Sequence, residues 1–241
     1  MLYFPGGGDS RLTRHPDDTI ARALGVRLLV VERPGCGLSD RARRWSLARW
    51  ARDVEQLADA LELGRFAVLG WSAGGPHALA AAAALPERVT RVVVAAGMPL
   101  PPWLGLVPED LQKVMRLARR TPFLAWQPLT RWSQKPVAST GDPDCDRVYA
   151  AGRVESFRRG PRWLVAELRV LGQPWGFDLA AIRTPVTLWY GERDEVCPPE
   201  IGRRFARALP NAELRVTDDS HQLLFTHWRD LLSEAAAPAS A

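Results

Sequence analysis

The sequence has few residues that could cross-link the chain, bind a metal or anchor it in a membrane. Its three cysteines, Cys36, Cys145 and Cys197, lie far apart and form neither a Cys-x-x-Cys pair nor a metal-ligand spacing, which favours ordinary reduced thiols. No apolar run approaches the ~18 residues of a membrane-spanning helix, and no signal-peptide pattern is visible. We therefore expect a cytoplasmic protein that binds no metal, other cofactor or membrane.

Lysine is nearly absent, since Lys113 and Lys135 are the only two, and arginine carries nearly all of the positive charge. The net charge is +5, but the arginines are scattered apart from small groups such as Arg41, Arg43 and Arg44. A nucleic-acid-binding protein needs a concentrated basic stripe with aromatic residues, or a recognisable module. Neither is present, so the sequence predicts no nucleic-acid partner.

The chain of 241 residues alternates short apolar runs with helical patterns, which is typical of an α/β fold. The predicted strands are Leu2–Phe4, Arg27–Glu32, Phe66–Trp71, Arg91–Ala96, Val186–Tyr190 and Glu213–Thr217. The predicted helices between and after them are Asp17–Leu24, Ser46–Leu63, Pro76–Leu85, Pro199–Leu209 and Trp228–Ala236. Strands separated by helices imply a mostly parallel sheet with helices on both faces.

Between Leu100 and Ile182 no clear strand occurs, and such a segment is too long for a loop between two core strands. Helical patterns over Leu111–Arg120 and Ser156–Leu171 predict an inserted helical lid. The predicted organisation is a core of residues 1–99 and 183–241 and a lid of residues 100–182. We expect tryptophans to bind an apolar substrate beneath this lid, although any one of them could instead only pack it. They are Trp71, Trp103, Trp126, Trp163 and Trp175.

The stretch Gly70-Trp71-Ser72-Ala73-Gly74 joins a predicted strand to a predicted helix. A Gly-x-Ser-x-Gly sequence in that context is typical of a nucleophile elbow, in which a strained turn presents the serine hydroxyl above the sheet. We therefore interpret Ser72 as a catalytic nucleophile. The backbone N–H of Ala73 and that of Gly7, in the Gly6-Gly7-Gly8 run after the first strand, are the predicted donors of an oxyanion hole.

A serine nucleophile needs a base, and the base needs an acid that orients it. Of the four histidines, His15 precedes the elbow, His227 is within or just before the last helix, and His221 lies in a loop after the last strand. We predict that His221 is the base, with His77 in the elbow helix as the alternative.

The acid should follow a strand, and Asp194 comes soon after Val186–Tyr190. Glu192 and Glu195 are its local rivals. The strand before the lid ends in Ala96-Gly97-Met98, which provides no acid.

These motifs together resemble the α/β-hydrolase superfamily, and more narrowly its capped, esterase-like serine enzymes. The resemblance covers essentially the whole chain. It rests on the elbow and on Tyr3–Arg11, Glu32–Ser39, Trp189–Asp194 and Ser220-His221. Three departures stand out: Pro5 occupies the place of a histidine before the oxyanion glycine, Ser220 replaces a glycine, and the chain begins almost at the family's third strand.

The resemblance implies that two strands precede this sequence in the family, which would leave Arg27–Glu32 as an open sheet edge. Open edges invite pairing with another chain. We therefore expect either a start codon further upstream, or cover from another segment or from a partner, for instance in a homodimer.

The resulting hypothesis is a serine hydrolase that cleaves a small apolar ester, or a related acyl substrate, through an acyl-enzyme. Haloalkane dehalogenases and epoxide hydrolases of this fold use an aspartate nucleophile, and Ser72 argues against both. Proline iminopeptidases, C–C bond hydrolases and acyltransferases remain alternatives. A second class of function is a receptor-like binding protein that retains the triad but turns over slowly or not at all.

Overall fold

The computed structural model describes residues 1–237, so the last four residues of the predicted core lie outside the described residues. Within that range one sheet has six strands, all parallel, in the order β2-β1-β3-β4-β5-β6. The strands are β1 (Leu2–Phe4), β2 (Leu29–Val30), β3 (Phe66–Trp71), β4 (Val89–Ala95), β5 (Val186–Gly191) and β6 (Ala212–Thr217).

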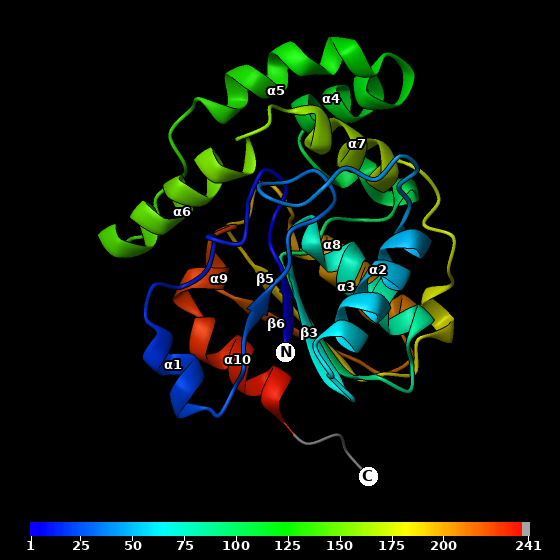
Figure 1. Cartoon of the computed structure of the whole chain (residues 1–241), viewed down its shortest axis with the longest axis vertical. Helices are drawn as coiled ribbons and strands as arrows, with labels where there is room; N and C mark the ends of the chain where they lie inside the picture. Colours follow the sequence, from blue (N-terminus) through cyan, green and yellow to red (C-terminus); the bar gives the residue numbers. More distant parts are fainter. Residues whose placement is uncertain (238–241) are drawn as a thin grey trace.

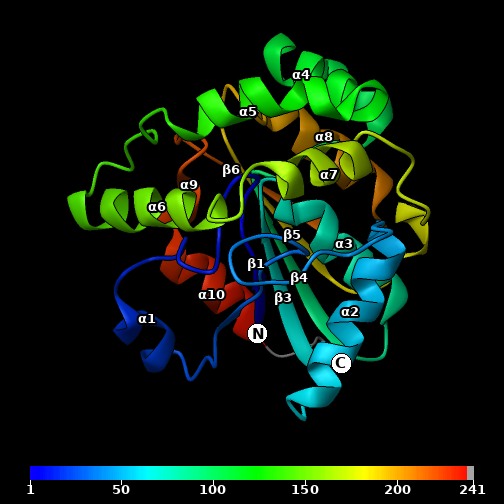
Figure 2. The same ribbon diagram turned by 45° about the horizontal axis from the view of Figure 1, so that its top comes forward.

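Helices cover both faces of this sheet (Figures 1 and 2). One face packs against α2 (Leu47–Ala60), α3 (Gly74–Ala84) and α8 (Pro199–Ala208), and the other against α1 (Asp18–Ala23) and α10 (Trp228–Ala236). A short helix, α9 (Leu223–Thr226), precedes α10. The predicted α/β architecture, with helices on both faces of a mostly parallel sheet, is confirmed.

The central strands are buried on both sides, as a covered parallel sheet requires. Every residue of β1, β3 and β5 is buried, and β4 contributes the fully buried run Val92–Ala95. These strands read as continuous apolar runs because neither of their faces meets water. The resulting core holds the loops at the carboxyl ends of the strands in fixed positions.

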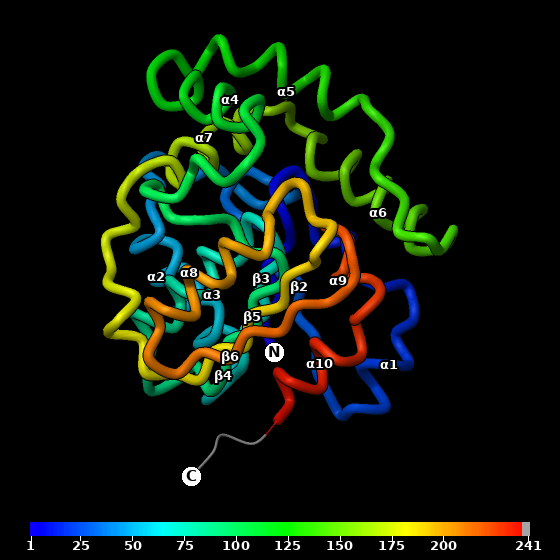
Figure 3. The backbone as a smooth tube through the Cα atoms, turned by 180° about the vertical axis from the view of Figure 1, so that it is seen from behind, coloured from blue at the N-terminus to red at the C-terminus, as the bar shows by residue number. Residues whose placement is uncertain are grey.

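The segment between β4 and β5 is helical, and we call residues 100–182 the cap. It contains α4 (Glu109–Arg120), α5 (Trp126–Ser133), α6 (Pro143–Ser156) and α7 (Arg162–Leu171), with 3₁₀ turns η1 (Pro101–Leu106), η2 (Pro122–Ala125) and η3 (Leu179–Ala181). Figure 3, seen from behind, shows α4, α5 and α7 above one end of the strands and α6 extending towards α9. The cap therefore lies over the carboxyl ends of the strands.

One predicted cap helix was wrong in its extent. The pattern over Ser156–Leu171 is broken in the structure, because α6 ends at Ser156 and α7 begins at Arg162. Between them Gly160 has a φ of 78° and is followed by Pro161. A glycine with positive φ lies outside the helical conformation, and a proline cannot donate a helical hydrogen bond, so this pair keeps the two helices separate.

The strand predicted over Arg27–Glu32 is also shorter in the structure, where β2 consists of Leu29–Val30 at one edge of the sheet. The N–H of Val31 still donates to the Tyr3 carbonyl oxygen, and after it the chain enters a loop that the Glu32 side chain holds. Its carboxylate accepts the backbone N–H of Arg11 at 3.2 Å and that of Leu38 at 3.0 Å.

Among the described residues, no helix has the length and apolar character to cross a membrane. The same part of the chain brings together no group of three or more His, Cys, Asp or Glu side chains that could hold a metal ion.

Candidate active site

Ser72 lies at the turn between β3 and α3, and its backbone adopts a left-handed conformation with a φ of 51°. This conformation is costly for a residue with a side chain and persists only where the surroundings enforce it. A Cβ on Gly74 would collide with the carbonyl oxygen of Phe4, and a Cβ on Gly70 would collide with that of Gly74. The two glycines of the motif are therefore required by close backbone approach at the turn.

His221 lies in the loop between β6 and α9, and its ring contacts both other members of the predicted triad. The Nε2 atom is 3.0 Å from the Ser72 Oγ, and the Nδ1 atom is 2.8 Å from the Asp194 Oδ2. Asp194, which is 3% exposed, accepts the N–H groups of Val196 and Cys197 with its other carboxylate oxygen, each at 2.8 Å. These bonds fix the carboxylate so that Oδ2 faces the imidazole.

The rival acids lie elsewhere. Glu192 and Glu195 are exposed, and the nearest cation to Glu192 is Arg203 on α8, at 3.8 Å. In the described part of the chain neither of these carboxylates hydrogen-bonds to His221, so of the three acids the structure brings only Asp194 to the imidazole.

The other three histidines form hydrogen bonds to groups other than Ser72. His77 is fully buried below the elbow, where its Nδ1 lies 2.8 Å from the Ala73 carbonyl oxygen. Burial, and secondarily the charge of Arg33, holds the pKa of the His77 imidazole well below its usual value. His227 lies between two aspartates of its own region, and His15 accepts a backbone N–H from Asp17.

The predicted oxyanion donors lie beside each other. A Cβ placed on Gly7 would be 3.3 Å from the Cβ of Ala73, and both residues border the same cavity as Ser72 and His221. Pro5, which departs from the family pattern, presents its carbonyl oxygen to the guanidinium of Arg33 at 2.6 Å. Arg33 is thus a site residue that motif matching missed, although the Glu32–Ser39 motif contains it.

A cavity of about 460 Å³ opens between this centre and the cap. Its wall is mostly apolar, with side chains from the elbow, α5 and α7. A volume of this size is typical of small-molecule sites. Its apolar wall includes Trp71, Met98, Leu129, Trp132, Leu164 and Leu168.

Of the five tryptophans predicted to bind substrate, only Trp71 borders this cavity. Trp103 and Trp175 both pack against Phe205 on α8, and Trp163 is buried at the base of the cap. Trp126 lies in a separate groove between the cap and residues 41–45.

Trp132, which was not among the predicted residues, is the cap tryptophan that lies in the cavity wall. It borders the cavity, and the guanidinium of Arg153 lies 3.8 Å from the centre of its ring.

The cavity also contains a buried charged pair that the sequence did not indicate. Arg153 on α6 and Asp9 after the glycine run are 6% and 3% exposed, and the Arg153 Nε lies 3.9 Å from the Asp9 Oδ1. Burial raises the pKa of Asp9 to about 6, although the charges of Arg153, Arg33 and His221 oppose the shift. The site therefore has a buried polar corner, and Asp110, Lys135 and Gln222 add further polar groups to its mostly apolar wall.

Comparison with known proteins places this geometry in a family. A model described as "alpha/beta hydrolase fold" matches residues 1–227. A pimeloyl-[acyl-carrier protein] methyl ester esterase from Nitrosomonas europaea is 34% identical over 199 residues, which cover 78% of this chain and 75% of that protein. A 2-hydroxy-6-oxononadienedioate/2-hydroxy-6-oxononatrienedioate hydrolase from Burkholderia vietnamiensis is 29% identical over 209 residues, 83% of this chain and 70% of that one.

Solved structures show the same fold. The esterase RhEst1 from Rhodococcus sp. ECU1013 superposes with a TM-score of 0.72 and 20% sequence identity, covering 97% of this chain and 90% of that one. A thermophilic esterase from Thermogutta terrifontis gives a TM-score of 0.71 and 21% identity, covering 96% and 85%.

Proposed function

Since the chain belongs to the α/β-hydrolase fold family, we propose that it is a serine hydrolase that cleaves a small ester, or a related acyl substrate, with an apolar body. The observation that carries the proposal is the continuous contact from the Ser72 Oγ to His221 and on to Asp194, at 3.0 and 2.8 Å. A nucleophile, its base and the acid that orients the base are the parts that acyl transfer requires.

The reaction follows from these positions. The Nε2 atom of His221 takes the Ser72 proton as Oγ attacks the substrate carbonyl, and it then protonates the leaving group. Asp194 accepts the Nδ1–H of the same ring, which keeps the correct tautomer and stabilises the imidazolium that forms. The N–H groups of Gly7 and Ala73 hold the oxyanion. Water, activated by His221, releases the acyl group from Ser72.

The cavity supports an apolar acyl group. Its wall is mostly hydrocarbon and indole, and burying an apolar acyl chain there is favourable by about 25 cal/mol per Å² removed from water. The nearest buried cation, Arg153, already has Asp9 beside it. We therefore expect neutral acyl esters to be better substrates than esters that carry a free carboxylate.

Labelling and turnover together test this proposal. A fluorophosphonate probe should modify the wild-type protein at Ser72 and leave the Ser72→Ala variant unlabelled, since only an activated serine reacts. The wild-type protein should hydrolyse p-nitrophenyl acetate, and Ser72→Ala should abolish turnover with its fold intact. Labelling without turnover would favour a receptor-like protein. Near wild-type turnover by Ser72→Ala would refute the mechanism.

Hydrolysis of a C–C bond is a second candidate, and Arg153 is the observation that favours it. The substrate named for the Burkholderia relative is a dioate, and a buried guanidinium in the cavity suits a carboxylate.

The Arg153→Gln variant separates the two candidates. If the protein is a hydrolase of neutral esters, Arg153→Gln should change kcat/KM for a neutral butyrate ester by no more than a few-fold. If Arg153 binds a substrate carboxylate, the hemi-ester of a dicarboxylic acid should be the better wild-type substrate. Arg153→Gln should then cost about 10-fold or more with that hemi-ester alone, because a hydrogen bond to a charged group is lost.

A further inference from the structure

Arg33 lies buried beneath the oxyanion loop, which we define as residues 5–9, and is 1% exposed. Its Nη1 donates to the carbonyl oxygen of Pro5 and its Nη2 to that of Gly6, each at 2.6 Å. The guanidinium is planar and rigid, so two bonds from one group fix two successive peptide units relative to each other.

The bond to Gly6 bears directly on the oxyanion hole. The carbonyl of Gly6 and the N–H of Gly7 belong to one planar peptide unit, and none of the described peptide bonds is cis. In a trans peptide the two groups point in opposite directions. Holding the Gly6 oxygen towards Arg33 therefore aims the Gly7 N–H away from Arg33, and the hole depends on this aim.

Arg33 is in turn held by the cap. The carboxylate of Glu167, on α7, contacts the Arg33 Nε through Oε1, and its Oε2 lies 3.5 Å from Nη2. Glu167 is 0% exposed. Burial raises the pKa of its carboxyl and the charge of Arg33 opposes that shift. Each buried charge would be costly without the other, so the position of α7 and the orientation of Arg33 are linked.

Two other cap helices clasp the same loop. The hydroxyl of Ser156, at the end of α6, donates to the Gly8 carbonyl oxygen at 2.6 Å. Trp132 on α5 covers Gly8 so closely that a Cβ there would be 2.5 Å from the indole. The oxyanion loop thus has cap side chains against it, and Glu167 acts on it through Arg33.

We propose that Arg33 and Glu167 are positioning residues that make the oxyanion hole depend on a docked cap. The inference rests on the proposed serine hydrolase. With α7 in place, Glu167 orients Arg33 and the Gly7 N–H faces the reacting carbonyl. When α7 moves away, Arg33 loses its counter-charge and no longer holds the carbonyl oxygens of Pro5 and Gly6 in place. The triad then remains intact, but the Gly7 N–H is poorly aimed at the oxyanion.

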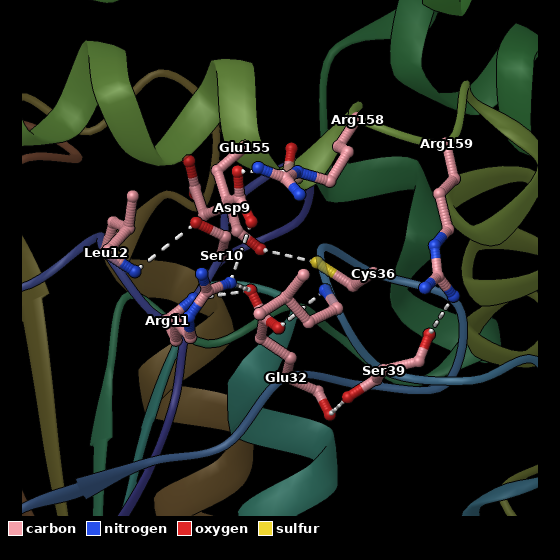
Figure 4. A network of polar contacts seen from close by, with 12 residues as sticks. Asp9, Ser10, Arg11, Leu12, Glu32, Cys36, Ser39, Glu155, Arg158 and Arg159 are labelled. Carbon is pink, nitrogen blue, oxygen red and sulfur yellow. Dashed lines mark hydrogen bonds and ion pairs between the residues drawn. The ribbon is translucent and has the colours of Figure 1, made fainter.

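The chain offers a matched control for loss of a cap carboxylate. Glu155 on α6 pairs with Arg11 at 2.9 Å and with Arg158 at 3.1 Å, and so joins the cap to the N-terminal segment (Figure 4). Its carboxylate bonds to these two arginines and not to the backbone of Pro5, Gly6 or Gly7. Glu155→Gln therefore weakens one contact between the cap and the core and leaves the Arg33–Glu167 pair unchanged.

Kinetics test the proposal in the wild-type protein, Glu167→Gln and Glu155→Gln. For Glu167→Gln, kcat for a p-nitrophenyl ester should fall about 10- to 100-fold with KM nearly unchanged, since the oxyanion exists only beyond the ground state. The Ki of a boronic acid that mimics the tetrahedral intermediate should rise by a similar factor. Glu155→Gln should change each quantity by less than about twofold. A Glu167→Gln protein with lower Tm but unchanged kcat and Ki would overturn the proposal.

Hydrogen–deuterium exchange gives a readout that needs no turnover. Amide exchange in residues 6–9 should be faster in Glu167→Gln than in the wild-type protein and in Glu155→Gln. Arg33→Lys should behave like Glu167→Gln, because one ammonium cannot reproduce the fork, and it replaces that variant if Glu167→Gln does not fold. Unchanged exchange in the variant used refutes the positioning role. An inactive, unlabelled wild-type protein refutes the proposed function, and the exchange result still decides whether the pair positions the loop.

Discussion

The Nε1 atom of Trp71 donates a hydrogen bond to the carbonyl oxygen of His221 at 3.0 Å. Trp71 directly precedes Ser72, the proposed nucleophile, so one indole joins the end of β3 to the loop that carries His221, the proposed base. The two rings also lie against each other, with centroids 5.5 Å apart. The distance between Ser72 and His221 therefore depends on a side chain that takes no part in proton transfer.

Trp71→Phe should consequently lower kcat about fivefold, because it removes a hydrogen bond worth about 1 kcal/mol and retains most of the ring. Steady-state kinetics with a short acyl ester measure this effect. Trp189→Phe is the control, since Trp189 is similarly buried and its indole nitrogen has no hydrogen-bond partner among residues 1–237. Equal loss of kcat in the two variants would contradict a role for the bond.

Replacement of the base should nearly abolish activity. We expect His221→Gln to lower kcat about 1000-fold or more, because triad members act as a unit and Ser72 would retain its proton. His227→Gln is the comparison, since His227 also lies beside an aspartate, Asp219, at 2.7 Å. It should retain most of the activity, and the reverse ranking would show that the base is misassigned.

The acid should act through the tautomer of the imidazole. Asp194→Asn keeps the shape of the side chain but presents an amide to His221, so kcat should fall about 100-fold or more. Glu192→Gln and Glu195→Gln, made in the same loop, should have little effect because both carboxylates are exposed. If either glutamine variant shows the large loss in kcat, Asp194 is not the acid.

The buried carboxyl of Asp9 should make stability depend on pH. Burial raises its pKa from 3.8 to about 6 in the folded protein, so the folded state binds more protons than the unfolded state between these values. The stability that Asp9 contributes is full below pH 3.8 and is lost as the pH rises through about 6. Asp9→Asn cannot undergo this loss.

The Tm of Asp9→Asn relative to wild type should therefore increase between pH 4 and pH 7. Loss of the counter-charge for Arg153 shifts the whole difference but not this trend, since arginine stays protonated throughout. Thermal unfolding of both proteins at several pH values measures it. A Tm difference that stays constant, or that falls with rising pH, would contradict the effect of burial.

Local sequence determined much of the fold. Apolar runs placed β1 and β3 within their observed bounds, and the alternation of strands and helices predicted the parallel sheet. Short-range rules suffice for these elements because periodicity, caps and glycine turns act over a few residues. The same rules, with the chain order of the family, singled out Ser72, Asp194 and His221, which the fold brings into contact.

Only the tertiary structure decided how the cap faces the core. Successive residues of a helix are turned by about 100°, so docking alone sets which side chain meets the cavity. Trp163 and Leu164 are neighbours on α7, yet only Leu164 borders the cavity. Likewise Trp126 and Trp132, both on α5, lie in different pockets.

The two buried charged pairs could not be predicted from the sequence either. Glu167 meets Arg33 although 134 residues separate them, and Arg153 comes from the cap to meet Asp9. Charged residues are normally solvent-exposed, and only packing of the cap on the core removes these four side chains from water. The sequence thus singled out the three residues of the proposed triad, while the packing of distant segments decided which side chains surround and orient them.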